Sequence, residues 1–383
     1  MTPENRLLLL LARGRLTPEA SSRALSLATR QIAWRALLEQ ARVHEVLPLV
    51  YRNLRALECS CVPEQIRAEL ETAHRKNALR NAVLARELTA VLRLFDESRV
   101  PVIPLKGVTL AQYLYGDLTL RMCRDLDVFV PRSFAAKALR LLLDRGYSGR
   151  CAQPFIANVA LRYGIECNLT REEDQFPYML ELHSGLFAGT SSENDAIGEL
   201  WAQAQPKIFF GVQALAMSPE CELLFFAVHA ARHQWQGLKW IVDIHEMCTQ
   251  AAIDWQKLQE TAIRLGWDEI LAVSLAASRA LCETEFPPNL SLKPLPSWLQ
   301  LFPAECRSID GPTMTAFIVR LLKRRSEKLD YLARALLTPT TAEAHALPLP
   351  AGLSFLYYPF RPVRLLTRWV ARSSAPAPPA AAR

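Results

Sequence analysis

The sequence contains no apolar run that approaches the roughly 18 residues needed to cross a bilayer. It also contains no C-x-x-C pair and no internal repeat, which excludes cysteine-rich zinc knuckles and repeat architectures. The first residues, MTPENRLLLLLARGR, place an acid before a short leucine run, which is a poor signal peptide. These absences predict a soluble, cytoplasmic protein without a transmembrane segment.

The composition is that of a globular protein with a substantial core. Half of the 383 residues are apolar and 22% are charged, which argues against wholesale disorder. The nine cysteines are scattered, a pattern typical of reduced, buried thiols. The formal net charge of +7 would suit a polyanionic or phosphorylated substrate, but it is too diffuse to require nucleic acid.

The hydrophobic periodicity changes several times along the chain. It is helical up to residue 98, and short extended runs then alternate with helical ones before the helical pattern returns. The fold class expected is α+β with an α/β core, in which a small mixed sheet is flanked by N- and C-terminal helical regions. We expect a helical region at 1–98, a sheet domain at 99–190, a helical domain at 191–300, a helical and loop extension at 301–372 and a disordered tail at 373–383.

The sheet domain has clear signals for its own elements. The runs VPVIPL, DLDVFVP, IECNLT and YMLELH are expected to be strands, and the last two form a hairpin joined by the polar REEDQFP. The run SFAAKALRLLLDRG predicts an amphipathic helix capped by Ser133. Further along, Ser218 precedes Pro219 and Glu220, a typical helix start.

Two carboxylates, Asp125 and Asp127, open the run DLDVFVP. Because side chains alternate along a strand, both acids face the same way and repel each other unless a cation neutralises them. Magnesium prefers oxygen ligands and is often held by one or two carboxylates together with substrate phosphates. A third acid, Glu181, lies in YMLELH. These three residues are predicted to be catalytic and to bind Mg²⁺, with two ions expected and Glu181 able to accept a proton.

Four residues near these acids are predicted to bind the phosphates of a nucleotide. Lys106 and Gly107 end the first strand and lead into a helix, where glycine lets the backbone approach a phosphate and Lys106 adds a charge. Arg121 and Arg124 precede the acid pair, and each guanidinium can hold phosphate oxygens with two hydrogen bonds.

Five other polar residues have two interpretations each, one functional and one structural. His183 is two positions past Glu181, so it contacts phosphate, orients Glu181 or is a hydrogen-bonded structural histidine. A pair of histidines one helical turn apart permits zinc geometrically, although a structural or substrate-facing role fits better because no third ligand is evident. A lysine and an aspartate four apart form a helical ion pair or contact the base or acceptor. These residues are His183, His229, His233, Lys239 and Asp243.

The C-terminal part of the chain is basic and amphipathic. The segment VRLLKRRSEKLDYLARALL either binds an acidic partner or is solvated on one side. The segment FRPVRLLTRWVAR permits peripheral contact with a membrane.

The order of these motifs resembles the nucleotidyltransferase superfamily of the DNA polymerase beta type, and more narrowly its bacterial branch known as the uncharacterised nucleotidyltransferase family. The resemblance covers most of the chain and includes VIPLKGVTLAQYLYGDLTLRMCRDLDVFV, LELHSGLF and MSPECELLFFAVHAARHQWQGLKWIVDIHEM. It implies that Asp125, Asp127 and Glu181 are metal ligands and that Gly107 lies at the nucleotide-binding turn. The superfamily carries Gly-Ser at that turn, whereas this chain has Lys106-Gly107-Val108.

The resemblance implies a Mg²⁺-dependent transfer of a nucleoside monophosphate from a nucleoside triphosphate to an acceptor hydroxyl or phosphate on a peptide, sugar or RNA, in natural-product or polysaccharide biosynthesis. Three alternatives remain at this point. One is a non-catalytic nucleotide-binding scaffold, which the absent serine leaves open. Another is a different phosphoryl-type transfer at the same site, for example modification of a phosphorylated peptide or a sugar phosphate. The third is a toxin-like enzyme that modifies transfer RNA, which the positive charge would suit.

Overall fold

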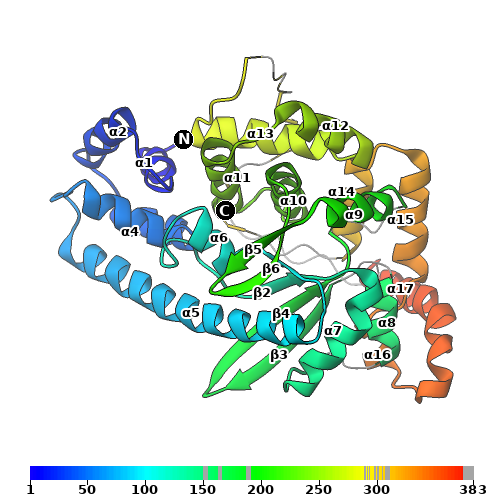
Figure 1. The fold of residues 1–383 in the computed structure, drawn as a ribbon. Helices are drawn as coiled ribbons and strands as arrows, with labels where there is room; N and C mark the ends of the chain where they lie inside the picture. The colour runs from blue at the N-terminus through cyan, green and yellow to red at the C-terminus, as the bar shows by residue number, and fades with distance from the viewer. Residues whose placement is uncertain are drawn as a thin grey trace.

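The computed structural model is an α+β structure in which helices surround a small mixed sheet (Figure 1). The predicted fold class is therefore confirmed. Within the described residues, no helix has both the length and the apolarity to cross a bilayer. The tail predicted at 373–383 lies outside these residues except for Ser373. The structure describes residues 1–149, 154–162, 166–186, 191–288 and 311–373, together with residues 290, 292, 294–296, 299, 302, 303, 305 and 306.

The N-terminal part is helical, as the periodicity predicts. Its longest helix, α5, crosses one face of the sheet (Figure 1). The buried side of α5, which includes Leu84, Leu88 and Phe95, shares a hydrophobic core with apolar residues of the central strands. This packing holds the sheet against the helical N-terminal part. The helices are α1 (Pro3–Leu11), α2 (Pro18–Ala28), α3 (Trp34–Val43), α4 (Leu47–Ala56) and α5 (Glu64–Glu97).

The main sheet has four strands in the described part of the chain, in the order β1-β2-β4-β3. The central strands β2 and β4 are parallel, and each outer strand is antiparallel to its neighbour. The two strands that carry the predicted acids therefore lie side by side at the centre. The elements are β1 (Ile103–Leu105), α6 (Gly107–Tyr113), β2 (Leu126–Phe129), α7 (Arg132–Asp144), α8 (Pro154–Arg162), β3 (Cys167–Glu173) and β4 (Phe176–His183).

Two local predictions in this region are wrong. Helix α7 begins at Arg132 directly after Pro131, and none of the described side chains caps it, so Ser133 is not its cap. The extended backbone of Pro131, with ψ of 144°, fixes the start of the helix two residues earlier than a cap at Ser133 would. The β3–β4 connection is also shorter than predicted, because only Asp174 and Gln175 form the turn, both with positive φ.

A second hairpin, β5–β6, lies where the sequence predicts helix. Phe210 and Gly211 both have positive φ and close the turn between its strands. The backbone N–H of Leu215 donates to the carbonyl of Val102, 3.0 Å away, which places the hairpin beside the β1 edge. The elements that follow β4 are α9 (Ser191–Gln203), β5 (Gln205–Phe209), β6 (Val212–Ala216), α10 (Pro219–Arg232), α11 (Leu238–Gln250), α12 (Trp255–Leu265) and α13 (Asp268–Cys282).

The C-terminal helices line one edge of the molecule, at the right in Figure 1. They are α14 (Gly311–Leu321), α15 (Arg325–Leu337), α16 (Thr341–Ala346), the 3₁₀ helix η2 (Ala351–Leu356) and α17 (Tyr357–Ser373).

The described cysteines are all free thiols, as the sequence predicts. Cys61 and Cys306 are exposed rather than buried, so the expectation of burial is wrong for these two. Cys151 lies outside the described residues.

Candidate active site

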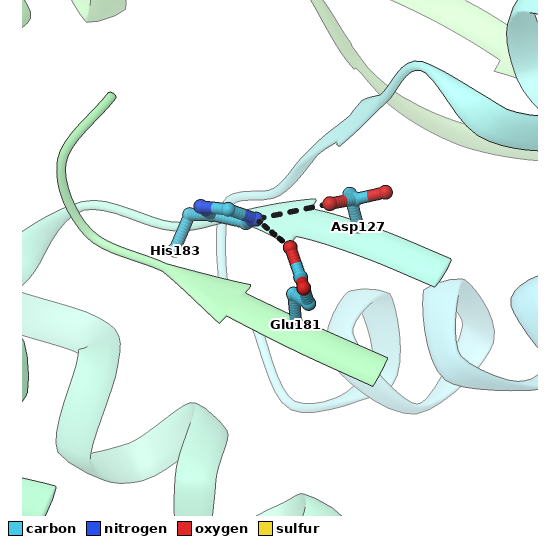
Figure 2. A group of neighbouring side chains, drawn as sticks. All are labelled: Asp127, Glu181 and His183. Carbon is cyan, nitrogen blue, oxygen red and sulfur yellow. Dashed lines mark hydrogen bonds and ion pairs between the residues drawn. The ribbon is translucent and has the colours of Figure 1, made fainter. Parts of the chain in front are cut away.

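The parallel pairing of β2 with β4 brings two of the predicted acids together. Asp127 is the register partner of Glu181, and His183 lies two residues further along β4. Because alternate residues of a strand share a face, the three side chains converge on the same side of the sheet (Figure 2). Their ligand atoms all lie within 4.8 Å of one another.

His183 bridges the two carboxylates. Its Nε2 atom lies 3.1 Å from Oδ1 of Asp127 and 3.4 Å from Oε2 of Glu181 (Figure 2). Burial alone would lower the pKa of His183, but its interactions with the two carboxylates raise the pKa to about 9. At neutral pH the imidazole is therefore protonated and carries a positive charge.

Lys106 supplies a second cation to the same carboxylate. Its Nζ atom lies 3.0 Å from Oδ1 of Asp127, and both side chains are almost fully buried. Burial opposes both charges, yet the pairing raises the pKa of Lys106 and lowers the pKa of Asp127. The chain thus neutralises Asp127 with its own side chains, Lys106 and His183.

A sharp turn places Lys106 there. Lys106 has φ of 23° and Gly107 has φ of 61°, so two successive residues have positive φ where β1 leads into α6. Such a conformation is strained for lysine and free of strain for glycine. A Cβ atom on Gly107 would lie 3.5 Å from the backbone oxygen of Asp125, so the turn runs close to the start of β2.

Asp125, the other acid of the D-x-D pair, lies apart from this group. It precedes β2, is half-buried and does not belong to the described side chains that could share one metal ion. It faces a neighbouring cavity instead. Its role as a metal ligand stays a prediction.

The neighbouring cavity has a volume of about 650 Å³ and gathers most of the other predicted side chains. Its size falls within the range typical of small-molecule sites. Of the predicted residues, those that do not line it are Gly107, Asp127, Glu181, His183 and Asp243. The lining residues are Val43, His44, Glu45, Lys106, Arg121, Met122, Cys123, Arg124, Asp125, His229, His233, Gly237, Lys239, Trp240, Glu305 and Cys306.

Arg121 is held in a buried ion pair at the wall of the cavity. Its Nε and Nη2 atoms donate to both carboxylate oxygens of Asp243 at distances of 2.8–3.2 Å, and the hydroxyl of Tyr115 donates to Oδ1 of Asp243 at 2.8 Å. The interpretation of Lys239 and Asp243 as a helical ion pair is therefore wrong. Contact between Arg121 and phosphate stays a prediction, and it would have to coexist with this pairing.

Two further basic side chains of the wall, Arg124 and Lys239, both form ion pairs with Glu45. Glu45 lies between α3 and α4 with φ of 56°, and no motif in the sequence indicates its role. Arg124 keeps two thirds of its side chain exposed, so it remains accessible to a ligand.

Three aromatic rings stack at one side of the cavity. The ring of His233 lies parallel to that of Trp240 at 4.0 Å, and His229 meets both edge-on. Burial and the charge of Lys106 lower the pKa of His229 well below its usual range, so this ring is neutral. Neither His229 nor His233 belongs to a group of described side chains that could bind zinc.

The acids at the centre of the sheet fit a divalent cation. Oδ2 of Asp127 is buried and has no hydrogen-bond donor among the described residues, although a buried carboxylate oxygen normally has a partner. Carboxylate oxygens are the ligands that magnesium prefers, and Glu181 offers two more beside it. The donor set of Asp127 and Glu181 therefore suits a hard metal ion.

Comparison with known proteins places the chain in a family. Residues 30–283, about two thirds of the chain, match the family described as uncharacterised nucleotidyltransferase. This range includes β1, β2, β4 and every residue named above for the carboxylate cluster. No curated protein and no solved structure matches the chain significantly. The chain belongs to the uncharacterised nucleotidyltransferase family and is an enzyme that transfers phosphorus-containing groups.

Proposed function

We propose that the protein transfers a nucleoside monophosphate from a nucleoside triphosphate to an acceptor hydroxyl or phosphate in a Mg²⁺-dependent reaction. We further propose that it is a nucleotidyltransferase of the DNA polymerase beta type. The observation that carries the proposal is the pairing of Asp127 with Glu181 on adjacent parallel strands, with an unpartnered carboxylate oxygen on Asp127.

In this proposal Asp127 and Glu181 hold Mg²⁺, and Asp125 contributes to a site for two ions. When bound, the metal would neutralise charge that develops on the triphosphate. Glu181 has the most exposed carboxylate of the buried cluster, so an acceptor hydroxyl can reach it and give up its proton there. His183 holds the carboxylates of Asp127 and Glu181 in position through its Nε2 atom.

The cavity beside the acids is proposed to bind the nucleotide. Trp240 and His233 offer flat ring surfaces, on which a nucleobase can stack. Lys106, Arg124 and Lys239 provide positive charge for the phosphates. In the structure each of these cations is paired with a carboxylate, so binding of phosphate would redistribute these ion pairs.

The proposal is tested by measuring pyrophosphate release with each of the four nucleoside triphosphates in the presence of Mg²⁺ and candidate acceptors. Asp127→Asn and Glu181→Gln should each lower the rate by about a thousandfold or more, because each removes charge that holds the metal or accepts a proton. Glu172→Gln, an exposed acid on β3 of the same sheet, is the matched control and should retain activity. Undiminished turnover in Asp127→Asn would refute the proposal.

The acceptor is proposed to be a peptide, a sugar or RNA. Mass spectrometry separates these classes, because the modified acceptor gains the mass of one nucleoside monophosphate. A transfer RNA acceptor is distinguished by growth arrest on expression of the wild-type chain but not of Asp127→Asn.

A further inference from the structure

The positive charge of the chain is not spread evenly. Residues 311–373 carry ten lysines and arginines but three aspartates and glutamates, a formal net charge of +7. Residues 1–310 have a formal net charge of −1. The diffuse surplus expected from the composition is therefore concentrated on the C-terminal helices, which lie outside the range of the family match.

The same helices expose an unusual number of large apolar side chains. Of the sixteen that are exposed among the described residues, ten belong to α15, η2, α17 and the segments between them. Soluble proteins rarely expose apolar side chains in such concentration unless something covers them. They are Leu329, Leu332, Leu336, Leu337, Leu347, Leu353, Phe355, Leu356, Val363 and Leu366.

Ion pairs fix the orientation of α17. Glu343 of α16 is fully buried and accepts hydrogen bonds from Arg361 at 3.0 Å and from Arg364 at 2.5 Å. Val363 and Leu366 each follow one of these arginines by two positions, a rotation of about 200° around a helix. They therefore point away from the protein, and 57% and 60% of their surfaces are exposed.

Helix α15, which packs against α17, also carries an apolar stripe. Leu329, Leu332 and Leu336 follow one another at spacings of three and four residues, so they lie on one side of the helix. Arg361 donates to the carbonyl oxygen of Ala335 at 2.7 and 3.0 Å, which holds α17 against the end of α15. The two helices also lie together at one edge of the molecule (Figure 1).

We propose that the exposed apolar side chains named above and the basic residues of 311–373 that do not pair with Glu343, together termed the C-terminal face, bind the surface of a membrane that contains anionic lipids. Aliphatic side chains gain free energy when they enter the boundary between headgroups and acyl chains, and lysines and arginines are attracted to anionic headgroups. An anionic bilayer would cover the apolar side chains and also attract the basic ones. A second copy of the chain would bring together two regions that each carry +7, and nucleic acid would leave the leucines uncovered.

Sedimentation of the full-length protein with phospholipid vesicles tests this proposal. One set of vesicles contains phosphatidylcholine alone, and the other contains equal parts of phosphatidylcholine and phosphatidylglycerol. We expect the protein to bind the anionic vesicles at least tenfold more tightly, and added salt should weaken this binding.

Two variants separate the apolar and the electrostatic contributions. Val363→Ser with Leu366→Ser should weaken binding to anionic vesicles by about tenfold or more, because two aliphatic side chains no longer enter the bilayer. Arg325→Gln with Lys328→Gln should also weaken it, by roughly thirtyfold, since each of the two charges contributes about 1 kcal/mol. Within the described part of the chain, neither Arg325 nor Lys328 forms an ion pair with an acidic side chain.

The matched control is Leu79→Ser with Ile263→Ser, which removes two apolar side chains that are at least as exposed as Val363 and Leu366 and lie far from the C-terminal face in sequence. This variant should bind vesicles as the wild type does. Circular dichroism and pyrophosphate release, measured for every variant, confirm that the fold is retained. The proposal is overturned if the wild type does not sediment with anionic vesicles, if the serine variant binds as well as the wild type, or if the face instead mediates a dimer in solution.

Discussion

The Nζ atom of Lys106 lies 3.0 Å from Oδ1 of Asp127 in a region almost closed to solvent. A strained turn holds the lysine in this place, since Lys106 has positive φ. The carboxylate that is proposed to hold a metal ion is thus neutralised by the chain itself. The proposed metal ion and Lys106 would therefore both contact the carboxylate of Asp127. Four predictions follow from this ion pair and from neighbouring contacts.

The first prediction concerns Lys106→Met. This variant should be less stable by about 3–5 kcal/mol, because it leaves the charge of Asp127 buried without its ammonium partner. Mg²⁺ should raise the melting temperature of the variant more than that of the wild type, since the cation restores the missing positive charge. Thermal unfolding with and without Mg²⁺ measures both effects. An equal response of the two proteins to Mg²⁺ would contradict a metal site at Asp127.

The second prediction concerns the buried pair of Arg121 and Asp243. Arg121→Met and Asp243→Asn should each destabilise the protein by about 3–5 kcal/mol, because each leaves a buried charge unpaired. The double variant should lose less than the sum of the two, which urea unfolding of all four proteins in a double-mutant cycle would show. Additive losses would mean that the two side chains do not stabilise each other.

The third prediction concerns the aromatic wall of the cavity. Trp240→Ala should weaken the binding of a nucleoside triphosphate by about fivefold to a hundredfold, because stacking on an aromatic ring contributes about 1–3 kcal/mol. Isothermal titration calorimetry with a non-hydrolysable triphosphate measures the change. The control is Trp255→Phe. Trp255 packs on Phe286 and does not line the cavity. Unchanged affinity in Trp240→Ala would place the base elsewhere.

The fourth prediction concerns pH and Glu222 of α10. Burial raises the pKa of Glu222 to about 7, even though Lys207 of β5 lies nearby, and the hydroxyl of Tyr113 faces the same carboxyl group. Since the folded pKa exceeds the unfolded one, the folded state holds its proton longer. The free energy of unfolding should therefore fall by about 1–3 kcal/mol as the pH rises from about 5 to about 8.

Glu222→Gln should remove this part of the pH dependence and should be more stable than the wild type at about pH 8, because no charge then has to form inside the protein. Urea unfolding at both pH values measures the difference. Glu260→Gln, an exposed acid on α12, is the control and should leave the pH profile as it is. An identical slope in wild type and Glu222→Gln would show that another group is responsible.

The sequence predicts the sheet well where strand periodicity and turn residues agree. The strands around Asp127 and Glu181 and the helix start at Ser218 are in their predicted places, and Ser218 accepts a hydrogen bond from the N–H of Cys221. Ser133 shows where sequence-based prediction of a helix cap fails. The cap depends on backbone geometry, and at the start of α7 the rigid Pro131 determines that geometry. The sequence does not predict the β5–β6 hairpin, because the hairpin contacts Val102, a residue distant in the chain.

The candidate site shows the same division. The spacing along β4 predicts that Glu181 and His183 share a face, and they do. The spacing does not predict which basic side chain forms an ion pair with which carboxylate. Glu45 and Asp243 hold basic side chains that the sequence associates with phosphate, and only the packing of α3, α11 and the sheet brings these charges together.

The parallel arrangement of β2 and β4 has a consequence for how the enzyme matures. Asp127 and Glu181 are 54 positions apart in the chain. Two parallel strands can pair only after the whole crossover segment between them is in place. Helices that form from local contacts appear earlier on the folding pathway. During refolding, the proposed carboxylate site should therefore assemble after most of the helical signal has returned, once the second central strand has docked.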